Sequence, residues 1–288
     1  MMVDGTSIIE EMTPMNLQLK NDKKTYLFLF ICLFNLYFAQ KTISFDFIAT
    51  YRLTSKKSSQ SQSKQQENFF LFLNEKESFF LSEKDLGRDT INFRASGEVD
   101  IAKLMSYRTY FSDRVYTTTE NHPQLSILKY NNDFFEYANN EFKQSWKINN
   151  EKKAIKNSPC TTATINAFGR DWEACFSQEY PFPFGPYKFN NLPGLIISVK
   201  DSEGLYDFEL IGFSKKKFDY KIEKVKKTVS KEEYYKVLKE LHFSSKIFDN
   251  MSTPDDPSSV NRMRKAHQNL LKSIDNYPID KDMRYIFD

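Results

Sequence analysis

The chain has few of the residues from which active sites are commonly built: of its 288 residues, three are histidines, three cysteines and two tryptophans. The histidines, His122, His242 and His267, lie far apart and lack the spacing of metal ligands. The G-x-S-x-G, Walker and dinucleotide-binding signatures are also missing. These absences argue against a metal, a cofactor and an enzymatic function.

An excess of one charge is lacking as well, because 41 Lys and Arg residues face 38 Asp and Glu residues and leave a net charge of +3. No basic cluster is interleaved with aromatic residues, so the sequence does not predict binding to nucleic acid. Hydrophobic residues make up 40% of the chain, which is enough to bury a sizeable core in one domain.

One long apolar run is present, from Tyr26 to Ala39, and lysines precede it as in the basic region of a secretory signal peptide. The run is shorter than the ~20 apolar residues of a membrane-spanning helix. We therefore predict a signal peptide over residues 1–39 that is removed near Ala39, with an uncleaved anchor as the alternative. Residues 1–14 do not fit this pattern and are expected to be a mis-assigned start. The processed chain is predicted to be exported and not to be an integral membrane protein.

Alternating apolar and polar residues predict β-strands through most of the processed chain. In residues 42–54, apolar side chains recur at every second position and Ile48 alone breaks the pattern. Residues 55–67 contain nothing apolar and are expected to form an exposed loop or a disordered hairpin tip. Asn149-Asn150 suggests a hairpin turn. Further strands are predicted over residues 68–82, 102–111, 114–119, 125–130 and 132–137.

Two helices are predicted after residue 228. Ser230 and Glu233 have the spacing of a capping box, and an amphipathic pattern follows them. A second helix is expected from Ser258 to Ile274. The sequence thus predicts a mainly β, α+β fold: an antiparallel curved sheet or open barrel in a β-rich domain of residues 40–245, with a C-terminal helical extension of residues 246–288 packed on it.

The segment Leu192-Pro193-Gly194-Leu195 predicts a type II turn, because proline suits the second position and glycine accepts the positive φ of the third. A hairpin is expected to follow, with Val199 opposite Tyr206 across the turn at residues 201–204.

A second hairpin is predicted around Gly169 and Arg170. If Phe168 opposes Asp171, the two cysteines that remain after processing, Cys160 and Cys175, are offset by about 13 Å along the strands. That separation exceeds the reach of a disulfide. We therefore predict two unpaired thiols.

The region from Trp146 to Phe213 resembles the GLPGLI family of exported envelope proteins of unknown function. The resemblance rests on a series of short motifs: Cys160, Ala163-Thr164, Phe168-Gly169-Arg170, Trp172, Glu179, Pro181, Gly185-Pro186-Tyr187-Lys188-Phe189 and Leu192-Pro193-Gly194-Leu195-Ile196. Two positions depart from the family pattern: Asn191 replaces its first glycine, and Cys175 stands where an aromatic residue is usual. The resemblance implies an envelope location and a mainly β fold, and it supplies no catalytic residue.

The candidate binding residues are Arg170, Trp172, Tyr187, Lys188 and Phe189, which could form the polar end of an aromatic-walled pocket for a peptide, a lipid or an envelope protein. Gly185, Pro186, Leu192, Pro193, Gly194 and Leu195 are expected to serve the backbone turn instead. The function favoured by the sequence is that of a periplasmic or secreted, non-catalytic accessory or binding protein. The alternative is a periplasmic hydrolase or an enzyme that uses Cys160 or Cys175.

Overall fold

The computed structural model describes residues 42–90, 103, 106–120, 123–130, 133–139, 145–221, 227–244 and 257–287. Within the chain, Lys41–Asp288 forms one compact unit. The predicted signal peptide and the proposed mis-assigned start lie outside the described residues. None of the described helices combines the length and the apolar character needed to cross a membrane.

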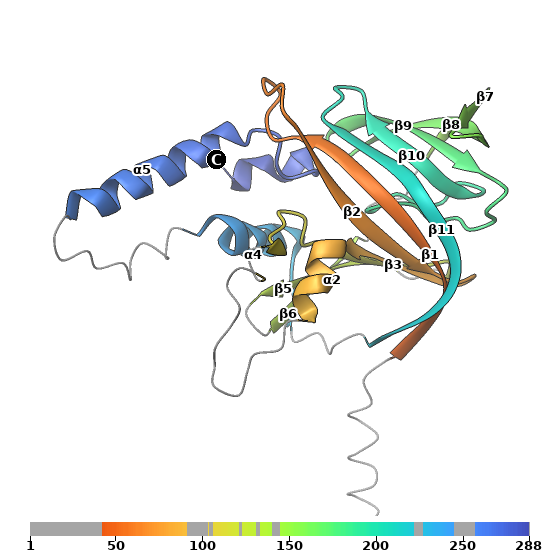
Figure 1. Cartoon of the computed structure of the whole chain (residues 1–288), viewed down its shortest axis with the longest axis horizontal. Helices are drawn as coiled ribbons and strands as arrows, with labels where there is room; N and C mark the ends of the chain where they lie inside the picture. The colour runs from red at the N-terminus through yellow and green to blue at the C-terminus, as the bar shows by residue number, and fades with distance from the viewer. Residues whose placement is uncertain are drawn as a thin grey trace, which may run out of the picture. The chain divides into compact units, whose positions relative to one another are not determined.

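The prediction of a mainly β fold with C-terminal helices is confirmed (Figure 1). A sheet of 12 strands has the order β12-β6-β5-β4-β3-β2-β1-β11-β10-β9-β8-β7, in which β12 and β6 are parallel and the other neighbours antiparallel. The strands are β1 (Thr42–Lys56), β2 (Lys64–Leu73), β3 (Glu77–Ser82), β4 (Arg114–Thr118), β5 (Gln124–Tyr130), β6 (Asp133–Asn139), β7 (Lys147–Ile155), β8 (Ser158–Ala167), β9 (Arg170–Ser177), β10 (Leu195–Asp201), β11 (Tyr206–Lys221) and β12 (Lys227–Thr228).

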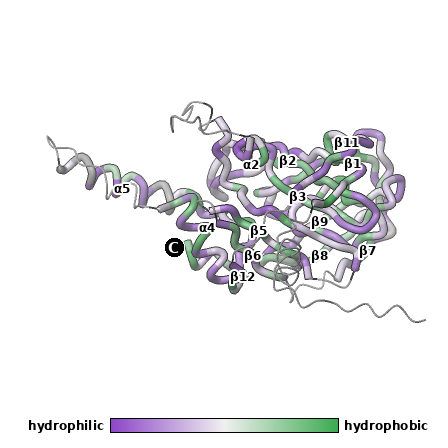
Figure 2. The backbone as a smooth tube through the Cα atoms, turned by 90° about the horizontal axis from the view of Figure 1, so that it is seen from below, coloured by the Kyte–Doolittle hydropathy of each residue, from purple (hydrophilic) through white to green (hydrophobic). Residues whose placement is uncertain are grey.

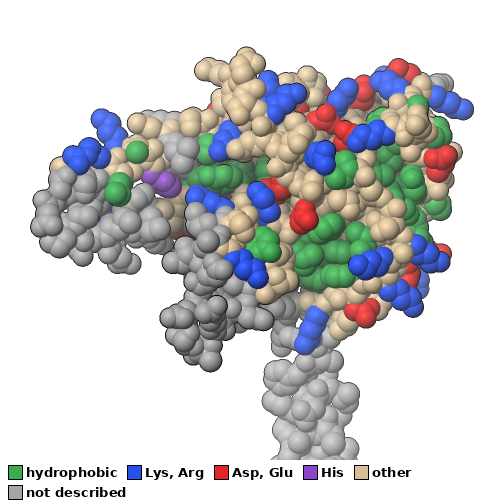
Figure 3. Space-filling model, in the orientation of Figure 1, with side chains coloured by type: hydrophobic (Ala, Val, Ile, Leu, Met, Phe, Trp, Pro, Cys, Tyr) green, Lys and Arg blue, Asp and Glu red, His purple; other side chains and the backbone are tan. Residues whose placement is uncertain are grey.

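The two faces of the sheet bury different apolar clusters, because successive side chains of a strand point to opposite faces. The inner face, as we call it, carries a large cluster that includes Tyr51, Leu71 and Trp172. The outer face carries a second, aromatic-rich cluster that includes Phe72 and Phe79. Hydrophobic and hydrophilic stretches accordingly alternate along the strands (Figure 2), and hydrophobic side chains gather over the sheet in the space-filling view (Figure 3).

The predicted helices are present as α4 (Lys231–Phe243) and α5 (Pro257–Ser273), and a 3₁₀ turn η2 (Lys281–Ile286) follows. Ser230 caps α4 in the predicted capping box with Glu233. The buried face of α4 carries Tyr234, Tyr235 and Leu238, which pack with β5, β6 and the C-terminal segment.

Several local predictions are wrong. The loop predicted over residues 55–67 is shorter than expected: it spans residues 57–63 at the tip of the β1–β2 hairpin, and the residues on either side of it belong to β1 and β2. Within the predicted strand 102–111, the described residues Lys103 and Ser106 are helical. A helix that the sequence analysis did not predict, α2 (Glu83–Asp89), is capped by Ser82 and follows directly on β3. Asn149-Asn150 lies at an irregularity inside β7, and the hairpin turn is at Lys156 and Asn157, both with positive φ.

The prediction of two unpaired thiols is wrong, because Cys160 and Cys175 form a disulfide between β8 and β9. The β8–β9 turn consists of Phe168 and Gly169, with φ of 57° and 66°, as a two-residue type I′ turn requires. This turn moves the register by two residues, so that Thr162 opposes Cys175. The cysteine Cα atoms then lie 5.5 Å apart, within disulfide reach.

The β10–β11 register also differs from the prediction by two residues, since Val199 lies opposite Phe208. The turn is longer than expected because Asp201 Oδ1 accepts hydrogen bonds from the amides of Leu205 and Tyr206, at 2.7 and 2.8 Å. A shift of two residues keeps each side chain of this pairing on its predicted face.

Candidate functional site

The motif loop, residues 178–194, connects β9 to β10 and packs against the inner face of the sheet. Phe189 contacts Trp172 with ring centroids 4.8 Å apart, and Tyr187 contacts Phe168 at 5.6 Å. The structure therefore brings together three of the predicted binding residues, Trp172, Tyr187 and Phe189. It places them in the core, with exposed fractions of 2%, 4% and 1%.

The segment Leu192-Pro193-Gly194-Leu195, at the end of the motif loop, does not form the predicted type II turn. The amide of Leu195 donates to the carbonyl of Tyr180 at 2.9 Å, and the amide of Gly194 donates to the carbonyl of Leu192 at 2.8 Å. Gly194 is required for a different reason: a Cβ atom there would lie 2.4 Å from the carbonyl oxygen of Ser177. The backbone of the motif thus lies against the end of β9, where a side chain would collide with it.

Lys188 extends from the same loop into a buried polar cluster. Its Nζ donates to the hydroxyl oxygens of Tyr137 and Tyr235, at 2.6 and 3.2 Å, and lies 4.8 Å from the ring centroid of Tyr187. The residue has an exposed fraction of 0%. These contacts give the ammonium hydrogen-bond acceptors and aromatic faces in place of water.

Two carboxylates, the buried Asp280 and the half-buried Asp113, complete this group. We call it the lysine cluster: Tyr137, Tyr187, Lys188, Tyr234, Tyr235, Asp113 and Asp280. Asp280 accepts a hydrogen bond from Tyr235 at 3.3 Å and pairs with Lys231 at 2.8 Å. Asp113 accepts a hydrogen bond from the hydroxyl of Tyr234 at 2.8 Å, and burial raises the pKa of its carboxyl.

Burial opposes the charge of Lys188, but its tyrosine neighbours and the carboxylates Asp113 and Asp280 outweigh burial, and the pKa of Lys188 lies well above its ordinary value. Lys188 is therefore a protonated ammonium at neutral pH. A charged lysine held in this way cannot act as a nucleophile, and its contacts join β6, the motif loop, α4 and the C-terminal segment.

Arg170, the remaining predicted binding residue, lies in a separate buried group at the start of β9. Its Nε donates to the carbonyl of Ile279 at 2.9 Å, and its Nη2 donates to Asn276 Oδ1 at 2.7 Å. The guanidinium also pairs with Asp201 at 3.5 Å and lies 5.0 Å from the ring centroid of Tyr206. Arg170 thus attaches the C-terminal segment to the sheet.

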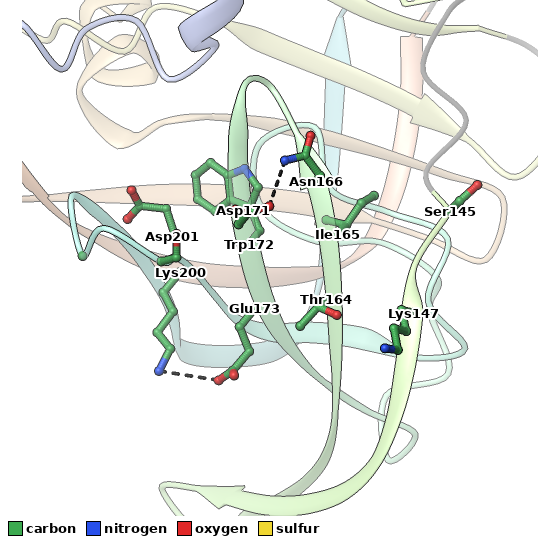
Figure 4. Close-up of a pocket in the computed structure, with 12 residues that line it drawn as sticks. Ser145, Lys147, Thr164, Ile165, Asn166, Asp171, Trp172, Glu173, Lys200 and Asp201 are labelled. Carbon is green, nitrogen blue, oxygen red and sulfur yellow. Dashed lines mark hydrogen bonds and ion pairs between the residues drawn. The ribbon is translucent and has the colours of Figure 1, made fainter.

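A groove of about 740 Å³ lies on the other side of the same strands (Figure 4). Side chains from neighbouring strands line it at facing positions, because Lys147 pairs with Thr164, Thr164 with Glu173, and Glu173 with Lys200. We call it the outer groove and define it by the polar residues Lys147, Thr164, Asn166, Asp171, Glu173 and Lys200.

Charges of both signs are fixed along the outer groove. Glu173 pairs with Lys153 at 3.2 Å and with Lys200 at 3.5 Å, and Asn166 Nδ2 donates to Asp171 Oδ1 at 2.8 Å. Partial burial acts to raise the pKa of Glu173, but the two ammonium groups outweigh it and lower the pKa. The groove therefore presents carboxylates, ammonium groups, an amide and a hydroxyl on a rigid sheet.

The Cys160–Cys175 disulfide lies beside this groove, because Cys175 and Glu173 are on the same face of β9. Both sulfur atoms are committed to the bond, so neither cysteine offers the thiolate required by a thiol-dependent enzyme. Across the described part of the chain, no group of His, Cys, Asp and Glu side chains has the arrangement of a metal site.

Sequence reasoning missed most of the outer groove. Among the predicted binding residues, only Trp172 contributes to its lining, from the buried side of β9. A usable signal was present in the alternating polar residues Asp171 and Glu173, which occupy the face of β9 opposite to Arg170 and Trp172.

No family model and no curated protein matches the chain. Two solved structures titled as PNGF-II, in the P21 and C2 space groups, are similar to it with TM-scores of 0.49 and 0.47 and sequence identities of 14% and 13%. The match covers 69% of this chain and 33% of the PNGF-II chain, so this chain aligns with about a third of that protein. A likeness of this degree gives no information on activity.

Proposed function

We propose that the protein is an exported, non-catalytic component of the cell envelope that binds a polar peptide segment in the outer groove. The observation that carries this proposal is the groove itself, where polar side chains from four neighbouring strands face one cavity of about 740 Å³. Cavities of this size suit small ligands and short peptide segments.

Export is supported by two independent features. The apolar run from Tyr26 to Ala39 has the composition of a signal peptide, and the resemblance to the GLPGLI family implies an envelope location. The disulfide between Cys160 and Cys175 agrees with both, since such bonds persist in oxidising compartments outside the cytosol.

A peptide suits the outer groove better than a lipid does. An acyl chain needs an apolar lining, whereas this lining presents both signs of charge. Thr164 and Asn166 offer hydrogen-bonding groups on one face of β8, two residues apart, and the charged side chains can pair with those of a peptide.

The groove is tested by the variant Thr164→Arg, which inserts a long side chain between Lys147 and Glu173. Amide chemical shifts of the processed protein are followed by NMR while a random hexapeptide library is added. We expect shifts confined to β7–β10 in the parent and their loss in the variant. The control is Gln62→Arg, which adds the same charge at an exposed position of the β1–β2 loop. Absence of shifts in the parent, or equal shifts in Thr164→Arg, would contradict the groove as a peptide site.

Export is tested separately by expressing the full chain in a Gram-negative host and measuring the mass of the protein in the periplasmic fraction. The expected species begins near Gln40 and is lighter by two hydrogens than its reduced form, since the disulfide is intact. A full-length, reduced protein retained in the cytosol would overturn the export proposal without bearing on the groove.

A further inference from the structure

A second cleft lies away from the outer groove, where the β1–β2 hairpin meets residues 108–111. Its volume is about 250 Å³, and none of its lining residues belongs to the outer groove. The walls are aromatic, formed by Tyr110 and Phe111, and the rim carries Lys84 and Arg108. A smaller adjoining cavity of about 20 Å³ shares Ser55, Gln65, Tyr110 and Phe111 with this cleft and extends it toward the C-terminal segment.

Two cationic side chains converge on the ring of Tyr110. Lys57 Nζ lies 5.7 Å and Arg108 Cζ 5.6 Å from the ring centroid. Neither cation has a carboxylate within ion-pair distance among the residues that the structure describes. Both therefore remain available to an anion that enters the cleft.

The one carboxylate that lines the cleft already has partners. Glu67 accepts hydrogen bonds from Ser82 and from Thr109, the latter at 2.6 Å, and lies 3.8 Å from the ammonium of Lys84. The charges of Glu67 and Lys84 offset one another. Lys57 and Arg108 then leave the site with a net positive charge.

A buried polar atom at the inner end of the site points to a ligand independently of these charges. Tyr277 lines the smaller cavity, has an exposed fraction of 6%, and its hydroxyl has no hydrogen-bond partner among the described residues. A buried hydroxyl without a partner carries a desolvation cost that a bound oxygen atom would relieve.

We propose that this cleft is a binding site for a small molecule that carries a carboxylate or phosphate group. Arg108 and Lys57 donate to the oxyanion, the ring of Tyr110 supports the body of the ligand, and Tyr277 donates its hydroxyl at the inner end. The site is independent of the proposed peptide groove, because the two cavities share no residue.

The proposal is tested by isothermal titration calorimetry of the processed protein with sodium phosphate and, separately, with sodium benzoate. If benzoate releases or absorbs heat on binding and phosphate does not, the cleft is a carboxylate site with an aromatic platform. If phosphate gives a binding heat and benzoate does not, the cleft is a phosphate site. The double variant Lys57→Ala/Arg108→Ala should weaken binding by about tenfold or more, because it removes two charge-assisted hydrogen bonds. The matched control, Lys152→Ala/Lys216→Ala, removes the same charge from exposed positions of β7 and β11 and should leave the affinity within about twofold.

A second variant, Tyr277→Phe, separates a binding role from a structural one. It deletes a hydroxyl that has no partner, so the unfolding midpoint without ligand should stay the same or rise, while the affinity for the bound anion falls by about threefold or more. Absence of heat with both anions, or equal weakening in the control variant, would overturn the site.

Discussion

The two faces of β9 carry charge in opposite ways. On the inner face, Arg170 is 6% exposed and is fixed by Asn276, Ile279 and Asp201. On the outer face, Glu173 is partly exposed and shares its charge between two lysine ammonium groups. A residue's place on one face or the other therefore decides whether its charge holds the fold or remains accessible to a ligand.

The same contrast separates the lysine cluster from the outer groove. Lys188 has the same charge as Lys200, yet its ammonium is surrounded by tyrosine hydroxyls and aromatic rings, whereas that of Lys200 reaches water and Glu173. Removing one partner of a buried charged group is strongly destabilising, because the other partner is left buried and uncompensated. Breaking an exposed ion pair changes the stability little.

The largest expected effect is that of Lys188→Met, which keeps an unbranched side chain but removes the charge. We expect a loss of about 3–5 kcal/mol in the free energy of unfolding, because Tyr137, Tyr235 and Asp280 lose their buried partner. Urea unfolding followed by circular dichroism measures this loss. The exposed control Lys216→Met should change stability by less than about 0.5 kcal/mol. A loss below about 1 kcal/mol for Lys188→Met would show that the lysine cluster does not hold the fold.

An intermediate effect is expected from His242 in α4. Its Nε2 is buried without a hydrogen-bond partner, and its ring lies 5.8 Å from Tyr110 and 6.1 Å from Tyr277. Burial, together with the charges of Arg88 and Arg108, lowers the pKa of His242 to about 3.

The unfolded chain therefore binds a proton at His242 below about pH 6.5, whereas the folded chain does not, and folding loses stability as the pH falls from about 6.5 toward 3. Between pH 7 and pH 5 we expect a loss of about 1–2 kcal/mol that His242→Phe removes. Urea unfolding at both pH values measures this loss. The carboxylates contribute equally to the pH dependence of the parent and the variant, so the difference between the two proteins reports on His242. Equal slopes in parent and variant would be inconsistent with a neutral buried imidazole.

The smallest effect is expected on the outer face, from Glu173→Gln. The variant breaks the ion pairs with Lys153 and Lys200, which are partly exposed, so the free energy of unfolding should fall by less than about 1 kcal/mol. Raising the salt concentration should shrink the difference further. A loss as large as that of Lys188→Met would remove the contrast between the two faces.

Local sequence patterns were enough for the elements whose signals are short-range. The alternation in residues 42–54 predicted β1, and the Ser230–Glu233 capping box predicted the start of α4. Asn191, which replaces the first glycine of the family motif, has a φ of 66°, a conformation that asparagine tolerates. The type II turn failed because Leu195 finds its hydrogen-bond acceptor in Tyr180, a partner that no four-residue pattern contains.

Register errors explain the wrong prediction for the cysteines. Both hairpins kept the predicted faces, because a shift of two residues preserves the alternation of a strand. The distance between Cys160 and Cys175 is sensitive to that shift, since each residue moves a side chain by about 3.3 Å along the strand. The β8–β9 turn is placed at Phe168 and Gly169 because Phe168 has a positive φ. A bulky residue rarely adopts that conformation, and no neighbouring residue in the sequence predicts it.

The sequence by itself determined the mainly β class, the late helices and the strands of the motif region, because hydrophobic periodicity and capping act within a few residues. Only the tertiary structure decided that the candidate binding residues Tyr187, Lys188 and Phe189 face the core, and that the outer groove lies on the opposite side of the same sheet. The physical reason is that burial depends on which segments pack against a strand, and the partners of Lys188 come from β6, α4 and the C-terminal segment, far away along the chain.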